Sequence, residues 1–308
     1  MKIALLTNDV ESTSLALNDL NNATAEKVFY EGMPKLLELY KKYDIKTTFF
    51  FTGEIIELFP EIVKLVIPYG HEVASHGYSH RPEEAFDLLS LEEQCNQLKK
   101  SKSLLEKYSN EEVISFRAPA LRVNKDTPKA LCRTGFLIDS SVASQRFDFF
   151  LTFGMNNKLK WLFAPRLPYF TSETDLTKKG NSKILEIPIT ALIFPYIGTT
   201  LRIFPKLTQL FRNFFIFESK LSGKPINFLT HPNEFINENV SQNFTRRAKG
   251  FISYILADKI RYLLKQKNLG SFGLDLYEKE IMVLIKNGFK FLTLKQYREL
   301  LIKGEFYG

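Results

Sequence analysis

Short apolar runs alternate along this chain with longer stretches of helical periodicity, and this alternation constrains the fold more than any other feature. The apolar runs occupy residues 3–6, 47–51, 72–74, 113–116, 136–138, 184–189, 226–229 and 289–292. A strand buried on both faces has such a sequence, and two parallel strands need a crossover that is usually helical. The pattern therefore predicts an α/β fold in which βα units surround a parallel sheet or barrel. We expect one domain over residues 1–308, with an irregular insertion at about 145–224.

Composition and charge are those of an ordinary globular protein with a basic surface. Hydrophobic residues make up 44% of the 308 residues, which is enough for a large core. Lys and Arg outnumber Asp and Glu by 42 to 34, for a formal net charge of +8. The chain has no run of five or six basic residues and no nucleic-acid-binding motif. We therefore expect no nucleic-acid partner.

The two cysteines and the first residues give expectations about the compartment. Cys95 and Cys132 do not form the spacing of a zinc site or of a thioredoxin motif, so we expect structural thiols. The first apolar run reaches polar residues at 7–9, too soon for the hydrophobic region of a secretory signal. Together these features favour a cytoplasmic protein.

Polar side chains with catalytic potential follow several of the apolar runs. Asp9, His76, Arg117, Asp139 and His231 each lie just past the end of one run. The carboxyl ends of parallel strands in a βα architecture share one face, where barrel enzymes build their active sites. We therefore expect these five side chains to gather at that face.

Two of the four histidines, His76 and His80, lie four residues apart. This spacing can aim both imidazoles at one point, and imidazole nitrogen is a favoured ligand of zinc and similar ions. A catalytic metal site also needs a third protein ligand, for which a carboxylate is suited, and an open position for water. Asp9 and Glu11, after the first apolar run, are the candidates for that ligand. Without such context, two histidines at this spacing are more often surface or packing residues.

Five short motifs stand in a fixed order along the chain. They are Thr-Asn-Asp-Val-Glu at 7–11, Ser-His-Gly-Tyr-Ser-His at 75–80, Phe-Arg-Ala-Pro-Ala at 116–120, Ile-Asp-Ser-Ser at 138–141 and Leu-Thr-His-Pro at 229–232. This ordered set resembles the motifs of the polysaccharide deacetylase family, also called the NodB-homology or carbohydrate esterase 4 family. The resemblance covers roughly residues 1–234, and residues 288–294 are similar to the family's closing βα unit. It implies a distorted, seven-stranded (β/α) barrel of the TIM-like kind, with an irregular insertion.

The resemblance also implies a metal-dependent site. Glu11, His76 and His80 would hold a divalent ion, with Zn²⁺ expected first and Co²⁺, Mn²⁺ or Ni²⁺ as alternatives. Commoner family members have two adjacent aspartates in the first motif, whereas here Val10 separates Asp9 from Glu11. The longer Glu11 side chain must then reach the ion, as in a subgroup similar to the peptidoglycan and imide hydrolases of the superfamily.

The resemblance assigns acid and base roles to the remaining motif residues. Asp9 would be the general base, and Arg117 would orient it and keep it ionised. His231 would be the general acid, with Asp139 as the partner of its imidazole. The structural alternative for Arg117 is a salt bridge that only braces the barrel.

The implied reaction is removal of an N-acyl group, acetyl or formyl, from an amino sugar of a glycan or of a lipid-linked saccharide. Residues 30–40 and 47–51 are similar to the subgroup that deformylates a lipid-linked aminoarabinose, which favours a lipid-linked sugar. Two alternatives remain open. One is an allantoinase-like or cyclic-imide amidohydrolase of the same superfamily, and the other is a non-catalytic carbohydrate-binding relative.

A basic and apolar segment at 187–217 is a second distinctive feature, because it contains no acidic residue. Its basic residues are Arg202, Lys206 and Arg212, and its apolar residues recur at helical spacing at Ile203, Leu207, Leu210, Phe214 and Phe217. Such a helix is typical of peripheral membrane contact, here on the inner face of a membrane. The alternative is an apolar helix packed on the barrel. The oligomeric state is left open by the sequence.

Overall fold

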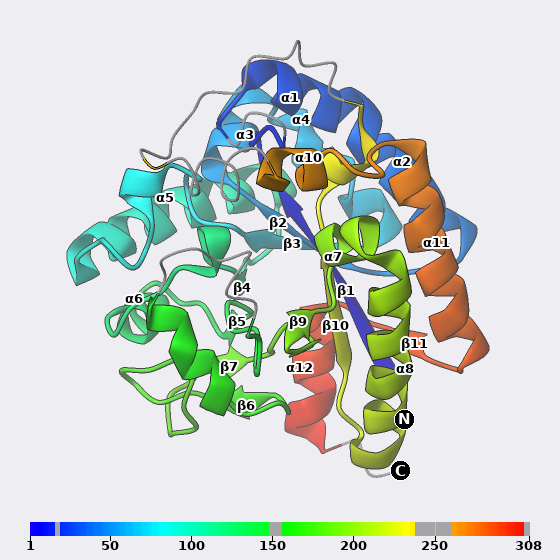
Figure 1. Ribbon diagram of the computed structural model, residues 1–308. Coiled ribbons are helices and arrows are strands. Elements are labelled where there is room, and N and C mark those ends of the chain that lie inside the picture. The colour runs from blue at the N-terminus through cyan, green and yellow to red at the C-terminus, as the bar shows by residue number, and fades with distance from the viewer. Residues whose placement is uncertain (16–18, 148–155, 238–249, 251–259, 305–308) are drawn as a thin grey trace.

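In the computed structural model, which describes residues 1–15, 19–147, 156–237, 250 and 260–304, parallel strands form one curled sheet (Figure 1). Their order is β10 (Ile226–Thr230), β1 (Ile3–Val10), β2 (Thr48–Phe51), β3 (Glu72–Ser75), β4 (Ser115–Phe116), β5 (Ile138–Asp139) and β7 (Leu185–Glu186). At its margins, β6 (Tyr169–Phe170) pairs antiparallel with β7, and β11 (Lys290–Phe291) pairs with the start of β1. The predicted apolar runs at these positions are therefore strands.

The sheet curls far enough for its two ends to meet. After β7 the chain returns to β10, where the Thr190 amide donates to the Asn227 carbonyl at 3.0 Å. The Asn227 amide in turn donates to Thr190 Oγ1 at 2.9 Å. The architecture is thus a distorted (β/α) barrel, which confirms the predicted fold class.

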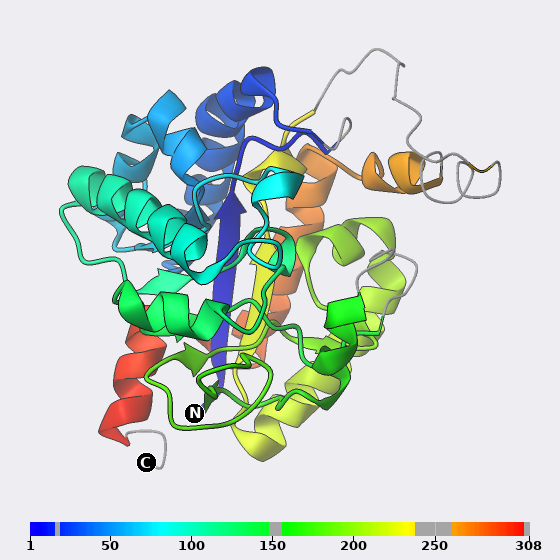
Figure 2. The ribbon, with the colours of Figure 1, turned by 90° about the vertical axis from the view of Figure 1, so that its left-hand side faces the viewer.

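Helices cover the outside of the sheet (Figures 1 and 2). They are α1 (Asn22–Lys27), α2 (Met33–Lys42), α3 (Gly53–Leu58), α4 (Glu61–Lys64), α5 (Leu91–Ser109), α6 (Thr127–Arg133), α7 (Gly198–Ile203), α8 (Pro205–Ser222), α10 (Arg261–Lys265), α11 (Ser271–Lys286) and α12 (Leu294–Lys303). Shorter helical turns are η1 (Val28–Gly32), η2 (Ile67–Tyr69), η3 (Pro82–Glu84), η4 (Pro119–Leu121), η5 (Asn156–Phe163) and η6 (Pro232–Phe235).

Local sequence sets several helix ends. A capping box starts α5, since the Glu93 amide donates to Ser90 Oγ and the Ser90 amide donates to Glu93 Oε2. Pro205 occupies the first turn of α8, where its missing N–H costs no hydrogen bond, and separates α8 from α7. The α7–α8 corner therefore follows from the sequence.

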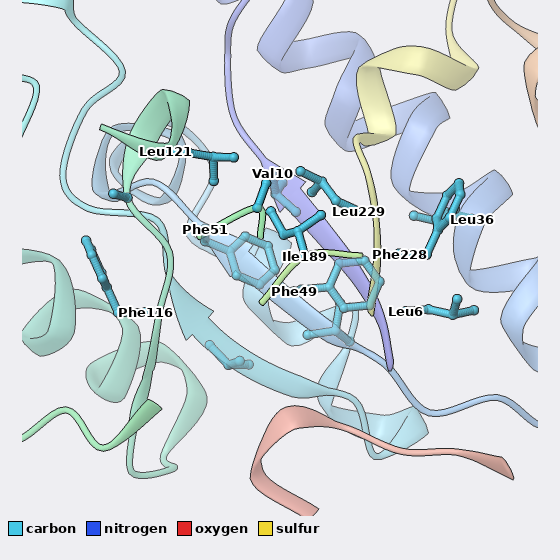
Figure 3. Packing of buried hydrophobic residues seen from close by; sticks show 14 of the residues in the cluster. Leu6, Val10, Leu36, Phe49, Phe51, Phe116, Leu121, Ile189, Phe228 and Leu229 are labelled. Atoms are coloured by element: carbon cyan, nitrogen blue, oxygen red, sulfur yellow. The ribbon is translucent and has the colours of Figure 1, made fainter. Parts of the chain in front are cut away.

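The larger hydrophobic core lies between the sheet and the helices. Leu6 and Val10 of β1 and Phe49 and Phe51 of β2 point outward into it, and Leu36 of α2 packs against them (Figure 3). Because successive strand residues face opposite sides, the intervening residues of β1 and β2 point into the barrel.

A second apolar cluster fills the barrel at the end where the strands begin. Ile3, Leu5 and Phe50 belong to it, and Leu294 and Tyr297 of α12 cover it. Figures 1 and 2 both show α12 beside the N-terminal end of β1. Among the polar side chains at this end is Glu72, which accepts hydrogen bonds from Thr48 Oγ1, Ser115 Oγ and the Lys295 amide at the start of α12. Asp9 and Arg117 lie toward the opposite end, where the strands finish.

The segment expected to be an insertion, about 145–224, is only partly one. It supplies the barrel strand β7, besides η5, β6, the hairpin of β8 (Ala191–Leu192) and β9 (Phe194–Pro195), α7 and α8. The division of the chain into a single domain stays a prediction. Within the described residues, no helix is both long enough and apolar enough to cross a bilayer.

Candidate active site

The inward face of β1 changes from apolar to polar toward the open end of the barrel. Ile3 and Leu5 pack in the inner cluster, and Thr7 and Asp9 follow on the same face. Glu11, just past the strand, also points to the site, where its carboxylate meets two histidines. Asp9 and Glu11 therefore both reach the site, although Val10 separates them in the sequence.

Asp9 and Arg117 form a buried ion pair inside the barrel. Arg117 Nη1 donates to Asp9 Oδ1 at 2.7 Å, and neither side chain is more than 3% exposed. The guanidinium also donates from Nε to the Ser140 carbonyl at 2.9 Å, and from Nη2 to Thr7 Oγ1 at 3.0 Å and Ser140 Oγ at 2.9 Å. Its face lies 4.3 Å from the ring centre of Phe50. Arg117 is therefore held from several strands and in turn fixes one oxygen of Asp9.

Asp9 is kept ionised by its surroundings. Burial alone would raise the pKa of Asp9, but the charge and hydrogen bond of Arg117, together with the electrostatic effect of the nearby His76 and His231 side chains, outweigh burial. The pKa of Asp9 therefore lies below its usual value of 3.8. Asp9 Oδ2, the oxygen not bonded to Arg117, lies 3.7 Å from His76 Nε2 and 3.9 Å from His231 Nε2.

Glu11, His76 and His80 converge, as the sequence predicted. His80 Nε2 lies 3.0 Å from Glu11 Oε2, and His76 Nε2 lies 3.9 Å from the same oxygen. The donor atoms of the three side chains all lie within 4.8 Å of one another. His76 Nδ1 donates to the Arg117 carbonyl at 2.8 Å, which leaves the lone pair on Nε2, the nitrogen that faces Glu11.

These residues fit a divalent metal ion. Glu11 Oε2 is buried, and although His80 Nε2 lies 3.0 Å away, no contact within the described residues has hydrogen-bond geometry. Such an oxygen is suited to a cation as its partner. Around a tetrahedral ion with bonds of about 2.0–2.2 Å, ligand atoms lie roughly 3.4 Å apart, close to the distances seen here. Burial lowers the pKa of His76, although Asp9 and Glu11 oppose this effect, so its imidazole is held in the neutral, metal-binding form.

His231 completes the group of inward-facing side chains from the opposite side of β1. It follows β10, and its Nε2 faces Asp9 Oδ2. Its Nδ1 is buried and accepts or donates no hydrogen bond within the described part of the chain. The predicted pairing of His231 with Asp139 is therefore wrong.

The register of β5 explains the position of Asp139. Asp139 pairs with Glu186 of β7, and Ile138 and Leu185, which precede them, belong to the inner cluster. Alternation then sends both carboxyl groups outward, away from His231. Asp139 accepts hydrogen bonds from Ser141 Oγ at 2.7 Å and the Ser141 amide at 3.2 Å.

Asp139 and Glu186 form a buried carboxyl pair behind the barrel wall. Burial raises the pKa of Asp139, although hydrogen bonds oppose this effect. Burial and the neighbouring Asp139 raise the pKa of Glu186 well above its usual value. A protonated Glu186 beside an ionised Asp139 is the arrangement that these surroundings favour.

Three of the predicted site residues, Glu11, His80 and His231, line one cleft of about 790 Å³. Its walls come from loops after several strands. The remaining lining residues include Thr13, Leu15, Asp19, Leu20, Arg81, Pro82, Glu83, Ala85, Pro119, Ala120, Arg122, Thr199, Arg202 and Lys265.

Two contributors to the site were not predicted. Ser140 holds Arg117, and Glu234 lies beside His231. The sequence does contain a signal for Glu234, because it follows His231 by three residues, the spacing of a capping box.

Comparison with known proteins gives a family match over part of the chain. Residues 11–138 match the sequence model of the family described as polysaccharide deacetylase. The chain is 34% identical over 116 residues to a peptidoglycan deacetylase of Helicobacter pylori, which covers 38% of this chain and 39% of that protein. It is 32% identical over 108 residues to a peptidoglycan-N-acetylglucosamine deacetylase of Bacillus cereus, covering 35% and 38% of the two. The matches thus span about two fifths of the length of these relatives.

A solved structure extends the similarity to most of the fold. It is a Mycobacterium smegmatis protein provisionally described as a polysaccharide deacetylase, and it covers 76% of this chain and 78% of its own. The TM-score is 0.54 at 18% sequence identity, which establishes a common fold and nothing further.

Proposed function

We propose that the protein hydrolyses the N-acyl amide of an amino sugar, since residues 11–138 match the sequence model of the polysaccharide deacetylase family. The observation that carries this proposal is the convergence of Glu11, His76 and His80 beside the Asp9–Arg117 pair. A metal-binding trio, a carboxylate base and a facing imidazole are the groups that amide hydrolysis needs.

Asp9 is suited to accept a proton from the attacking water. Arg117 occupies Oδ1 and keeps the carboxylate ionised, so Oδ2 is the oxygen that takes the proton. Since Oδ2 lies near both His76 and His231, the water is activated between the metal-binding trio and the second imidazole. Its oxygen then forms the new bond to the acyl carbon.

His231 is suited to protonate the leaving nitrogen. An amine leaves an amide only when it is protonated, and His231 Nε2 faces the site across from the metal-binding trio. As the C–N bond breaks, the nitrogen takes the proton from Nε2, and the products are a free amine and a carboxylic acid. The proposed acid and base are neighbours, with His231 Nε2 3.9 Å from Asp9 Oδ2.

Glu11, His76 and His80 would hold the divalent ion, for which we propose Zn²⁺. When bound, the ion supplies Lewis acidity for the amide carbonyl and for the attacking water. The neutral Nε2 of His76, oriented by the Arg117 carbonyl, fits this role.

For the substrate we propose an N-acetyl or N-formyl amino sugar of a glycan or of a lipid-linked saccharide. The cleft of about 790 Å³ lies in the upper part of the range of about 300–1,000 Å³ that is usual for ligand pockets. A saccharide longer than one ring uses such a space better than the small cyclic amide of a ring-opening amidohydrolase.

A peripheral membrane contact of α8 fits a lipid-linked substrate. Leu207, Leu210, Phe214, Phe217 and Leu221 lie on α8 at spacings of three and four, and their exposed fractions run from 36% to 73%. This stripe is therefore not packed on the barrel, as the alternative would require. Only the other face of α8 packs there. An exposed apolar patch of this kind favours a partner surface.

The charges on α8 favour an anionic bilayer over a second copy of the chain. Of the predicted basic residues, Arg202 and Arg212 are engaged by Glu234 and Glu280, but Lys206 is exposed, as is Lys220. Two such faces packed together would place lysines against lysines without acidic partners. We propose that the protein works at the inner, cytoplasmic face of a membrane.

The activity is tested by acyl release from a panel of substrates. The purified protein is loaded with Zn²⁺, Co²⁺, Mn²⁺ or Ni²⁺ and offered N-acetyl and N-formyl amino sugars that are free, oligomeric or linked to polyprenyl phosphate. Acetate or formate release that His76→Ala abolishes is the expected result. Turnover of allantoin or a cyclic imide alone, or saccharide binding without turnover in the metal-loaded protein, would contradict the proposal.

The membrane contact is tested separately by vesicle flotation. We expect the protein to float with vesicles that contain phosphatidylglycerol and to lose this in the Phe214→Ser/Phe217→Ser variant. Phe272→Ser, at an exposed position on α11, is the matched control. Flotation of the double variant at the wild-type level would exclude the membrane role. A wild-type dimer in solution that becomes a monomer in the double variant would exclude it as well.

A further inference from the structure

A buried ion pair lies directly behind His231. Arg202 Nη2 is 3.2 Å from Glu234 Oε1, and the two side chains are 1% and 0% exposed. Arg202 belongs to α7, and Glu234 to the turn η6 that follows β10. The pair therefore joins the helix before α8 to the loop that carries the proposed general acid.

Glu234 fixes the backbone around His231. Its Oε2 accepts a hydrogen bond from Thr230 Oγ1 at 2.8 Å and from the His231 amide at 3.4 Å. Its Oε1 accepts one from Thr199 Oγ1 at 2.7 Å, in addition to the contact with Arg202. Both carboxylate oxygens are thus used, and each is tied to an element that lines the cleft.

The fit between α7 and Glu234 is close. A Cβ added to Gly198, the first residue of α7, would overlap both Glu234 Oε2 and Thr230 Oγ1. Arg202 Nη1 also donates to the carbonyls of Lys265 and Lys267, at 3.1 and 2.7 Å. Arg202 thereby links Glu234 to the C-terminal segment that forms another wall of the cleft.

Glu234 carries its charge in this position. Burial alone would raise its pKa, but the charges of Arg202 and His231 and the hydrogen bonds from Thr199 and Thr230 lower it below the usual value. Asp139, the carboxylate expected to serve His231, faces the other side of the barrel wall. Glu234 is thus the anionic group that contacts the His231 backbone.

We infer that Glu234 is a positioning residue for His231, and that α7 holds it in place through Arg202 and Thr199. The inference rests on the proposed function of His231 as the acid. Glu234 itself does not touch the reacting atoms. It sets the backbone and the local field of the imidazole that does, so the segment between β7 and β10 contributes to the acid half of the reaction.

Three variants separate this role from simple bracing. Glu234→Gln removes the charge at constant shape, and we expect kcat to fall about 10- to 100-fold while KM changes less than about twofold. Glu234→Gln/Arg202→Met removes both charges, so folding stability should recover relative to Glu234→Gln while kcat stays low. Glu280→Gln, which disrupts the comparable Arg212–Glu280 pair outside the cleft, is the control with wild-type kcat.

A spectroscopic readout does not depend on turnover. The chain has four histidines, so the His231 imidazole signal in a carbon–proton correlation spectrum can be assigned with a His231→Gln sample. In metal-free protein we expect Glu234→Gln to move this signal and to leave the His71 signal in place. Because this test needs no substrate, it stands even if the wild type releases no acyl group.

Two outcomes would overturn the inference. One is a double variant that recovers kcat together with stability, because the pair would then only brace the fold. The other is an unmoved His231 signal in Glu234→Gln, which would show that the carboxylate does not act on the imidazole.

Discussion

Removing the Arg117 side chain should cost the folded protein a large part of its stability. In Arg117→Met, Asp9 keeps its buried carboxylate but loses the 2.7 Å ion pair, and Thr7 and Ser140 lose their guanidinium donors. Breaking one side of a buried pair costs about 3–5 kcal/mol, because the remaining charge is left without compensation. We therefore expect the free energy of unfolding to fall by about that amount at pH 8.

The loss of unfolding free energy in Arg117→Met should be smaller at low pH, because of the titration of Asp9. In the wild type, the pKa of Asp9 is below its usual value, so its stabilising contribution is present at neutral pH and lost as the pH falls through the acid range. Without Arg117, the same carboxyl should take up a proton more readily, which removes the unpaired charge. The difference in unfolding free energy between the wild type and Arg117→Met should therefore become smaller as the pH falls from 8 to 5.

Urea unfolding of metal-free protein measures this effect, with the single tryptophan, Trp161, as a buried reporter. A loss of about 3–5 kcal/mol moves the midpoint by roughly 1 M or more. Arg133→Met is the control, because the Arg133–Glu92 pair is 57% and 78% exposed and should not contribute measurably. A wild-type midpoint for Arg117→Met at pH 8 would refute the reasoning, as would a loss that does not shrink in the Asp9→Asn background.

Three further predictions concern single side chains. Burial, helped by the charge of Lys46, lowers the pKa of His71 from 6.5 to about 4, so stability should fall by about 3 kcal/mol as the pH drops through that interval. His71→Asn, whose amide oxygen can replace the Nδ1 acceptor for the Thr47 amide, should flatten this pH dependence in urea titrations; an unchanged slope would exclude His71 as its source. His76→Ala should lose the bound ion in metal analysis of the dialysed protein, and full retention would remove His76 from the ligand set. Asp9→Asn should keep the ion yet lose about two to four powers of ten in kcat, and a wild-type kcat would exclude Asp9 as the base.

Much of the fold was predictable because buried strands have a recognisable local pattern of apolar residues. The runs at 3–6, 47–51 and 226–229 became β1, β2 and β10, since strands covered on both faces must be apolar throughout. The capping box of Ser90 and Glu93, which begins α5, is another such local signal. The apolar run that forms the barrel strand β7 was also predicted, but the expected insertion included it. An insertion leaves no periodic signal that would mark its bounds.

The candidate site was predictable where it depends on position along a strand. Glu11 and His76 meet because they directly follow β1 and β3, whose carboxyl ends share one face, and His80 lies in the loop after β3. Asp139 also lies at a strand end, but a two-residue strand does not show which side chain faces inward. In the structure, Ile138 packs in the inner cluster, and alternation therefore turns Asp139 outward.

By itself, the sequence determined the alternation of strands and helices and the end of the barrel at which the candidate ligands Glu11, His76 and His80 gather. Only the tertiary structure decided that the sheet curls back on β10 and that α7 brings Arg202 to Glu234. It also decided that α8 leaves its apolar stripe exposed. The physical reason is one of range. Periodicity over a few residues encodes which face of an element is buried, whereas contacts between residues 202 and 234 or 190 and 227 depend on strand register and sheet curvature, which only the assembled chain specifies.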